Sequence, residues 1–250
     1  MRARDIESYE RDFRRNGRDS DGKTHSLRSI AVSIPGDAEK LNVVVCQPAN
    51  GDRSYYYKDQ PVKQRVVIHF TAGYLKGDVA TLTKKDYHVS VPFLVARDGT
   101  IYNLFSSKNW SYHLGPGAKG GNKTMSKSSI GIEISNIGPL TRSGNNLNTI
   151  YGQTYCSLDE RQFYDKKSYR NYDYYATYTD AQYKSLVPLL RYATGAYHIP
   201  RQFLNSQKRY NTLDEITQFF GVTSHVNFRS DKYDIGPAFD WNRVISGVTA

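Results

Sequence analysis

Two of the six histidines in the chain lie at positions where they could bind a metal ion. His69 ends an apolar run that begins at Val66, so its imidazole is expected to emerge from the end of a buried strand into a cleft. His225 opens an irregular segment near the C-terminus that also contains Lys232 and Asp234. Two imidazoles and one carboxylate, completed by water, are typical ligands of catalytic zinc. Residue types alone leave open the alternative that both histidines are hydrogen-bonded structural residues.

A carboxylate that could transfer protons lies on a segment of alternating polarity. Three isoleucines within residues 129–135 alternate with Gly131 and Glu133, which predicts a strand with the isoleucines on one face. Glu133 then lies on the opposite face, a placement that suits a general base pointing into a cleft. The alternative is an ordinary carboxylate facing solvent.

The elements that must position these residues are strands followed by a helix. Residues 89–96 and 101–105 are β-rich and are joined through Asp98-Gly99, a strong hairpin signal. Thr179 and Gln182 have the spacing of a capping box, and apolar residues after them repeat with the helical period. This order predicts an α/β fold with a mixed central β-sheet and packed helices.

The charge and hydropathy of the chain limit its partners. Lys and Arg exceed Asp and Glu by 34 − 24 = 10, which favours a polyanionic partner such as nucleic acid, a membrane surface or a bacterial envelope polymer. No nucleic-acid-binding module is recognisable, so nucleic acid is not the expected partner. The longest apolar runs are far shorter than the ~20 residues of a membrane span. No secretory signal is expected at the N-terminus, because it mixes charges and lacks an apolar stretch.

The chain divides into a lead-in and a main domain. Residues 1–60 are expected to form an N-terminal arm and a strand-rich lead-in, with the first 27 or so residues favoured as a solvated extension. Residues 61–250 form the expected catalytic domain, with a surface insertion at about 141–178 that contains eight of the 21 tyrosines. Cys46 and Cys156 fit no metal-binding spacing, and a disulfide between them is left open.

Six pieces of the chain, taken in order, carry a family resemblance. They are Val66 to Ala72, Val89 to Gly99, Trp110 to Gly115, Ser129 to Glu133, Tyr178 to Gln182, and His225 to Trp241. Together they resemble the amidase-2 family of N-acetylmuramoyl-L-alanine amidases, which includes phage lysozyme-type amidases and animal peptidoglycan-recognition proteins. The resemblance covers about residues 62–245 and implies an amidase-2/peptidoglycan-recognition-protein-like fold.

The resemblance assigns chemical roles to five of these residues. His69, His225 and Asp234 fall on the positions that bind Zn²⁺ in the family. Glu133 falls on the carboxylate that acts as general base, and Lys232 on a lysine that stabilises the tetrahedral oxyanion. Zinc is expected to activate water and to polarise the substrate carbonyl. The implied reaction is hydrolysis of the amide bond between N-acetylmuramic acid and L-alanine.

Other positions are implied to bind substrate or depart from the family pattern. His113 matches a position that lines the substrate groove, with simple packing as the alternative, and Trp110 is a candidate for stacking on sugar. Val91 stands where some members have a catalytic tyrosine, and Pro92 replaces the usual neighbouring histidine. The family's Asp-Pro-Gly is replaced here by Asp234-Ile235-Gly236, which keeps the ligand but changes the loop.

Several biological settings are compatible with this chemistry. The favoured one is bacteriolytic, endolysin-like cleavage of bacterial peptidoglycan, with the protein made in the cytoplasm and acting at the cell wall or periplasm after release or delivery. The alternatives are an antibacterial toxin, a recycling amidase, or a peptidoglycan-binding module without catalysis. A delivery or inhibitor protein is left open as a partner, and the oligomeric state is not predicted.

Overall fold

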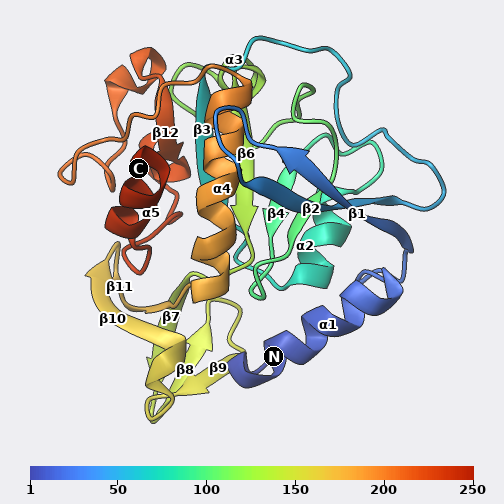
Figure 1. Ribbon diagram of the computed structural model, residues 1–250. Coiled ribbons are helices and arrows are strands. Elements are labelled where there is room, and N and C mark those ends of the chain that lie inside the picture. The colour runs from blue at the N-terminus through green and yellow to red at the C-terminus, as the bar shows by residue number, and fades with distance from the viewer.

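A mixed seven-stranded sheet forms the centre of the computed structural model, which describes residues 1–250 (Figure 1). Its strand order is β1-β2-β5-β4-β6-β3-β12, and β4, β6, β3 and β12 run parallel. The predicted hairpin at Asp98-Gly99 is confirmed, because β4 and β5 pair antiparallel. The strands are β1 (His25–Ser33), β2 (Lys40–Pro48), β3 (Arg65–Phe70), β4 (Phe93–Val95), β5 (Ile101–Asn103), β6 (Ser129–Ile134) and β12 (Gly221–Ser224).

Helices cover both faces of this sheet, so the expected mixed α/β architecture is confirmed. Helices α4 (Asp180–Ala196) and α5 (Trp241–Thr249) pack on one face, where alternate residues of β3 and β6 form the largest apolar cluster. The opposite face is covered by α1 (Ile6–Asn16), α2 (Leu75–Leu82) and α3 (Asn122–Lys127). The capping box of Thr179 and Gln182 is present at the start of α4. None of the helices is long and apolar enough to cross a membrane.

The tyrosine-rich insertion folds as a second sheet, which lies below the central one in Figure 1. Its order is β10-β11-β7-β8-β9, and every pairing is antiparallel. Its strands are β7 (Pro139–Ser143), β8 (Asn146–Thr149), β9 (Thr154–Ser157), β10 (Tyr164–Tyr169) and β11 (Tyr172–Ala176). Four short 3-10 helices complete the chain: η1 (Ala3–Asp5), η2 (Arg161–Phe163), η3 (Asp214–Gln218) and η4 (His225–Asn227).

The expectation of a solvated N-terminal extension is wrong. Ile6 packs in the apolar cluster of the second sheet, and Phe13 packs with α2 beneath the central sheet. Both side chains are buried, because α1 places its few apolar residues on one face. Cys46 and Cys156 are free and lie in different clusters, so the disulfide left open by the sequence does not form.

Glu10 links α1 to the β4–β5 hairpin. Its carboxylate accepts hydrogen bonds from the backbone N–H groups of Arg97, at 3.1 Å, and Asp98, at 3.2 Å. Burial raises the pKa of Glu10 from its usual 4.5 to about 7. The native state keeps its full stability below pH 4.5, where Glu10 is protonated in both the native and the unfolded protein. It loses stability as the pH rises through about 7, because burial disfavours the ionised form.

Replacing Glu10 by glutamine should remove this pH dependence. We expect the free energy of unfolding of Glu10→Gln, relative to wild type, to increase by up to about 3 kcal/mol between pH 5 and pH 8. Urea denaturation at both pH values measures the difference. Glu7→Gln, on the exposed side of the same helix, is the control and should show no such change. A difference that is constant with pH would contradict the assignment.

Candidate metal and catalytic site

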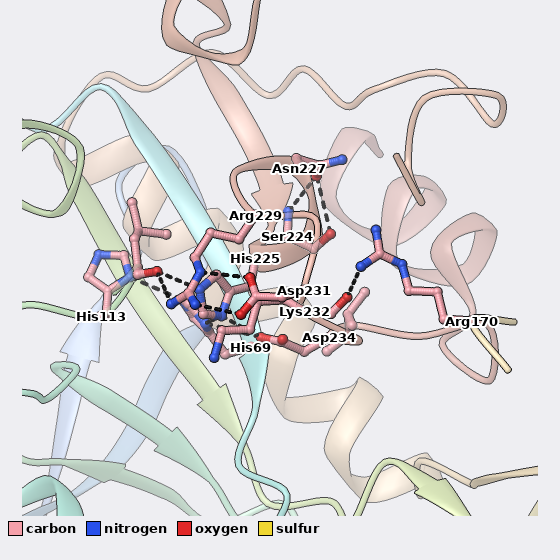
Figure 2. A network of polar contacts seen from close by, with 12 residues as sticks. His69, His113, Arg170, Ser224, His225, Asn227, Arg229, Asp231, Lys232 and Asp234 are labelled. Atoms are coloured by element: carbon pink, nitrogen blue, oxygen red, sulfur yellow. Dashed lines mark hydrogen bonds and ion pairs between the residues drawn. The ribbon is translucent and has the colours of Figure 1, made fainter. Parts of the chain in front are cut away.

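Three side chains from separate segments meet at the carboxyl end of the parallel strands. His69 is near the end of β3, and His225 is the first residue of η4, directly after β12. Because β12 pairs in parallel with β3, the two strands end side by side. Asp234 lies in the loop that follows η4, and its backbone carbonyl accepts a hydrogen bond from Val226 at 2.9 Å. Figure 2 shows the three side chains pointing toward one another.

The spacing of the three ligand atoms suits a metal ion. His69 Nδ1 lies 3.0 Å from His225 Nδ1 and 3.2 Å from Asp234 Oδ2, and the two latter atoms are 3.0 Å apart. A tetrahedral zinc ion with bonds of about 2.05 Å separates neighbouring ligand atoms by about 3.3 Å. All three residues are buried. The cluster could therefore hold a metal ion of this size.

A chain of hydrogen bonds fixes the tautomer of His69. Ser129 Oγ donates to the carbonyl oxygen of Met125 at 2.6 Å, so His113 Nε2 must donate to Ser129 Oγ at 2.9 Å. In neutral His113 the other nitrogen, Nδ1, is then an acceptor, and it takes the proton of His69 Nε2 at 3.0 Å. These protons are assigned from the hydrogen-bond network. The result is a lone pair on His69 Nδ1 that faces the cluster.

His225 presents the same kind of atom to the cluster. Its Nε2 donates to the carbonyl oxygen of Leu114 at 2.9 Å, which leaves Nδ1 as the acceptor in the neutral ring. With both rings neutral, two nitrogen lone pairs and a carboxylate oxygen converge on one point. Such a group requires a positive charge at its centre, either a proton or a metal ion, and these donors are those that zinc prefers.

The pKa values of His69 and Asp234 suit metal binding at neutral pH, which requires a neutral imidazole and an ionised carboxylate. Burial lowers the pKa of His69 to about 4. Burial, together with the neighbouring His69 and His225, holds the pKa of His113 well below its usual value. Burial acts to raise the pKa of Asp234, but the contacts with His225 and His69 outweigh it and lower that pKa.

Glu133 and Lys232 line the same cavity as His225 and Asp234, two of the three candidate ligands. Strand β6 pairs in parallel with β3 and places Glu133 directly beside His69, on the sheet face opposite α4. Glu133 Oε2 is buried without a hydrogen-bond partner. Burial, reinforced by the carboxylates of Asp234 and Asp78, raises the pKa of Glu133 well above its usual value. Lys232 lines the cavity, which has a volume of about 580 Å³.

A second cavity of about 460 Å³ adjoins the first and shares Glu133 with it. Its lining includes Tyr9 from α1 and Tyr151 from the turn between β8 and β9. Glu133 therefore lies between two adjoining cavities and not at the closed end of a single cavity. An extended polymer could pass across this carboxylate.

The two predicted substrate contacts occupy different positions. His113 lines the cavity, but both of its ring nitrogens are engaged, with His69 and Ser129. Trp110 does not line it: the indole is buried, stacks on Tyr57 at 4.3 Å and donates to Asp59. The geometry therefore gives no support to stacking of Trp110 on sugar.

Ser129, the hydrogen-bond partner of His113, was not among the predicted site residues. Its only sequence signal is its position at the start of the strand that carries Glu133.

Removing the nitrogens of His113 should weaken metal binding. In His113→Phe, the N–H of His69 Nε2 loses its acceptor, so the tautomer that presents Nδ1 is no longer enforced. We expect metal affinity to fall about 10–100-fold, as is typical when the partner of a ligating histidine is removed. Competition with a chromogenic chelator measures the affinity. His198→Asn, at an exposed histidine, is the control, and equal affinities in the two variants would contradict the relay.

Comparisons with known proteins agree on one family. Residues 58–237 match the family model Amidase_2, described as N-acetylmuramoyl-L-alanine amidase. The N-acetylmuramoyl-L-alanine amidase AmiD of Escherichia coli (strain K12) is 25% identical over 185 residues, which are 72% of this chain and 51% of AmiD. This chain thus spans about half the length of that curated relative.

Solved structures with the same fold include a complex of E. coli AmiD with anhydro-N-acetylmuramic acid-L-Ala-D-gamma-Glu-L-Lys. It is 23% identical with a TM-score of 0.50, and the match covers 87% of this chain and 65% of that one. A selenomethionine derivative of AmpD is 20% identical with a TM-score of 0.46, over 78% of this chain and 90% of that one. The family match and the likeness to AmiD confirm the predicted amidase-2-like fold.

Proposed function

This chain belongs to the amidase-2 family of N-acetylmuramoyl-L-alanine amidases, and on that basis we propose that it hydrolyses the bond between N-acetylmuramic acid and L-alanine in bacterial peptidoglycan. One observation carries the proposal: the buried cluster of His69, His225 and Asp234 lies beside Glu133, which is paired with His69 across β3 and β6 and lines the same cavity as His225 and Asp234. The substrate seen with AmiD contains the same kind of bond. We further propose zinc as the metal.

The side chains in and around the cluster would have separate roles in the reaction. His69, His225 and Asp234 would hold the zinc ion, which when bound supplies Lewis acidity for activating water and polarising the amide carbonyl. Glu133 would accept the proton of the attacking water and return it to the leaving nitrogen of L-alanine. Its unpartnered Oε2 atom leaves a lone pair available for that proton. The ammonium of Lys232, in the same cavity, would stabilise the negative charge that develops on the carbonyl oxygen.

The biological setting that we propose is endolysin-like lysis at the cell wall, after release or delivery of the protein. The net charge of +10 supports it, because intact wall is anionic. An antibacterial toxin or a recycling amidase would use the same chemistry on the wall or on its fragments. A binding module without catalysis is disfavoured, because the candidate metal ligands and Glu133 occur together.

Digestion of purified peptidoglycan followed by mass spectrometry tests the reaction. We expect free stem peptides that begin at L-alanine, their loss after treatment with a chelator, and their recovery on addition of zinc. Soluble muropeptides assayed in parallel distinguish wall lysis from recycling. If glycopeptides stay intact in the presence of fully metal-loaded protein, the proposed activity is wrong. A peptidoglycan-binding module without catalysis would then be the better interpretation.

A further inference from the structure

The loop that carries Lys232 and Asp234 has no regular structure of its own. Residues 228–240 contain neither helix nor strand, so their backbone carbonyls need partners from elsewhere. Side chains of the tyrosine-rich insertion bind four of these carbonyls. Arg170 Nη1 donates to the carbonyl oxygens of Ser230 and Lys232. Figure 2 shows the Arg170 guanidinium reaching the Lys232 carbonyl from the side of the loop away from the metal cluster.

The insertion contacts the same loop beyond Asp234. The hydroxyl of Tyr178 donates to the carbonyl oxygen of Ile235 at 2.8 Å, and Lys167 Nζ donates to that of Pro237 at 3.1 Å. The Tyr172 ring meets Tyr233 edge-on, with ring centroids 5.4 Å apart. The donors from the insertion therefore bracket Asp234 on both sides along the chain.

Arg170 is itself held in place by the turn that presents it. Arg170 and Asn171 form the turn between β10 and β11, and both have positive φ angles, 46° and 68°. The guanidinium lies over the Tyr169 ring at 5.3 Å, and the Tyr169 hydroxyl donates to the carbonyl oxygen of Tyr210. A planar guanidinium fixed in this way can hold two carbonyls with little further loss of conformational entropy.

We infer that Arg170 is a positioning residue that sets the geometry of Lys232 and Asp234 through their backbone. The inference rests on the proposed function, because it is the roles of Lys232 and Asp234 that give this loop its importance. Fixing the carbonyl of Lys232 restricts the direction in which its side chain leaves the loop. Asp234 is only two residues away, and a displacement of its carboxylate would open the group of three ligand atoms.

Variants of Arg170 in the full chain test this role. In Arg170→Ala, we expect metal affinity to fall about 10–100-fold, the range found when support of a metal ligand is removed. The value of kcat should fall with little change in KM, because the substrate groove remains. Arg170→Lys should lie between Arg170→Ala and wild type, since an ammonium can still donate to both carbonyls but lacks the rigid planar group that holds the donor in place.

A matched control and a double variant separate positioning from general stability. Arg142→Ala removes an exposed arginine of the same insertion that bonds only within its own hairpin, and it should behave as wild type. If Arg170 acts through Lys232, then Lys232→Ala should cost less activity in the Arg170→Ala background than in wild type. If Arg170→Ala only lowered the stability of the protein, the effects of the two substitutions on activity would be additive.

The outcomes distinguish this inference from the proposed function. Zinc affinity is measured by competition with a chelator, so the ratio of wild type to Arg170→Ala is obtained whether or not the protein cleaves peptidoglycan. Equal zinc affinities in the two, or additive effects of the double variant, would overturn the inference alone. If Arg170→Ala does not fold, Arg170→Lys takes its place in this comparison. Its zinc affinity should be lower than that of wild type, and an affinity equal to that of wild type would overturn the inference.

Discussion

Replacing Glu133 by glutamine is expected to lower kcat for peptidoglycan cleavage by about 10²–10⁴-fold, the usual contribution of a general base. Glutamine has nearly the same size as glutamate but has no basic oxygen that could take a proton from water. Since Glu133 is not one of the three candidate ligands, the zinc content of the variant should equal that of wild type. Mass spectrometry of released stem peptides, together with metal analysis of the same samples, measures both quantities.

The pH dependence of cleavage provides an independent check on Glu133. Burial raises the pKa of its carboxyl, and only the ionised form can accept a proton. The value of kcat/KM should therefore rise with pH as Glu133 loses its proton, with a midpoint above the usual carboxyl range. That limb should be absent from the residual activity of Glu133→Gln. Full activity in the variant would assign the base to another residue.

Replacing Asp234 by asparagine is expected to abolish metal-dependent activity and to weaken zinc binding by more than ~100-fold, since even the loss of a ligand's partner costs 10–100-fold. The metal-free protein should behave differently. An asparagine amide can donate a hydrogen bond to the lone pair of His69 or His225, where the carboxylate only accepts. The metal-free variant should therefore stay folded, which allows its response to zinc to be measured.

Thermal unfolding with and without zinc separates the two effects of Asp234→Asn. Wild type should gain in Tm when zinc is added, because a ligand that binds only the native state stabilises it. The variant should show no such gain. Asp231→Asn is the matched control, because Asp231 lies in the same loop, is exposed and pairs with Arg229. A zinc-dependent gain in Asp234→Asn equal to that of wild type would exclude Asp234 as a ligand.

The local sequence was sufficient to locate the elements that carry the site. Side chains alternate between the two faces of a strand, so the isoleucines around Glu133 predicted both the buried face of β6 and the polar one. The Asp98-Gly99 turn and the capping box of Thr179 were readable for the same reason, since each depends on residues that are close in the chain. The candidate ligands and Glu133 followed from residue types and order, through the family resemblance.

The insertion and the N-terminal arm were less predictable. Their burial depends on a shared apolar cluster, in which Ile6 meets residues more than 130 positions away, such as Leu140. The strands of the insertion are rich in tyrosine and lysine, and they lack the clean alternation of a half-buried sheet. Contacts of this kind leave little local pattern in the sequence.

The sequence by itself determined which residues could bind a metal, transfer a proton or hold a negative charge, because these capacities belong to the side chains. Only the tertiary structure decided how those groups are arranged. His69 and His225 are 156 positions apart and meet because β3 and β12 pair in parallel. The tautomer of His69 depends on Ser129 through His113, and the loop of Asp234 depends on Arg170. Such hydrogen bonds depend on distance and direction in space, which spacing along the chain does not specify.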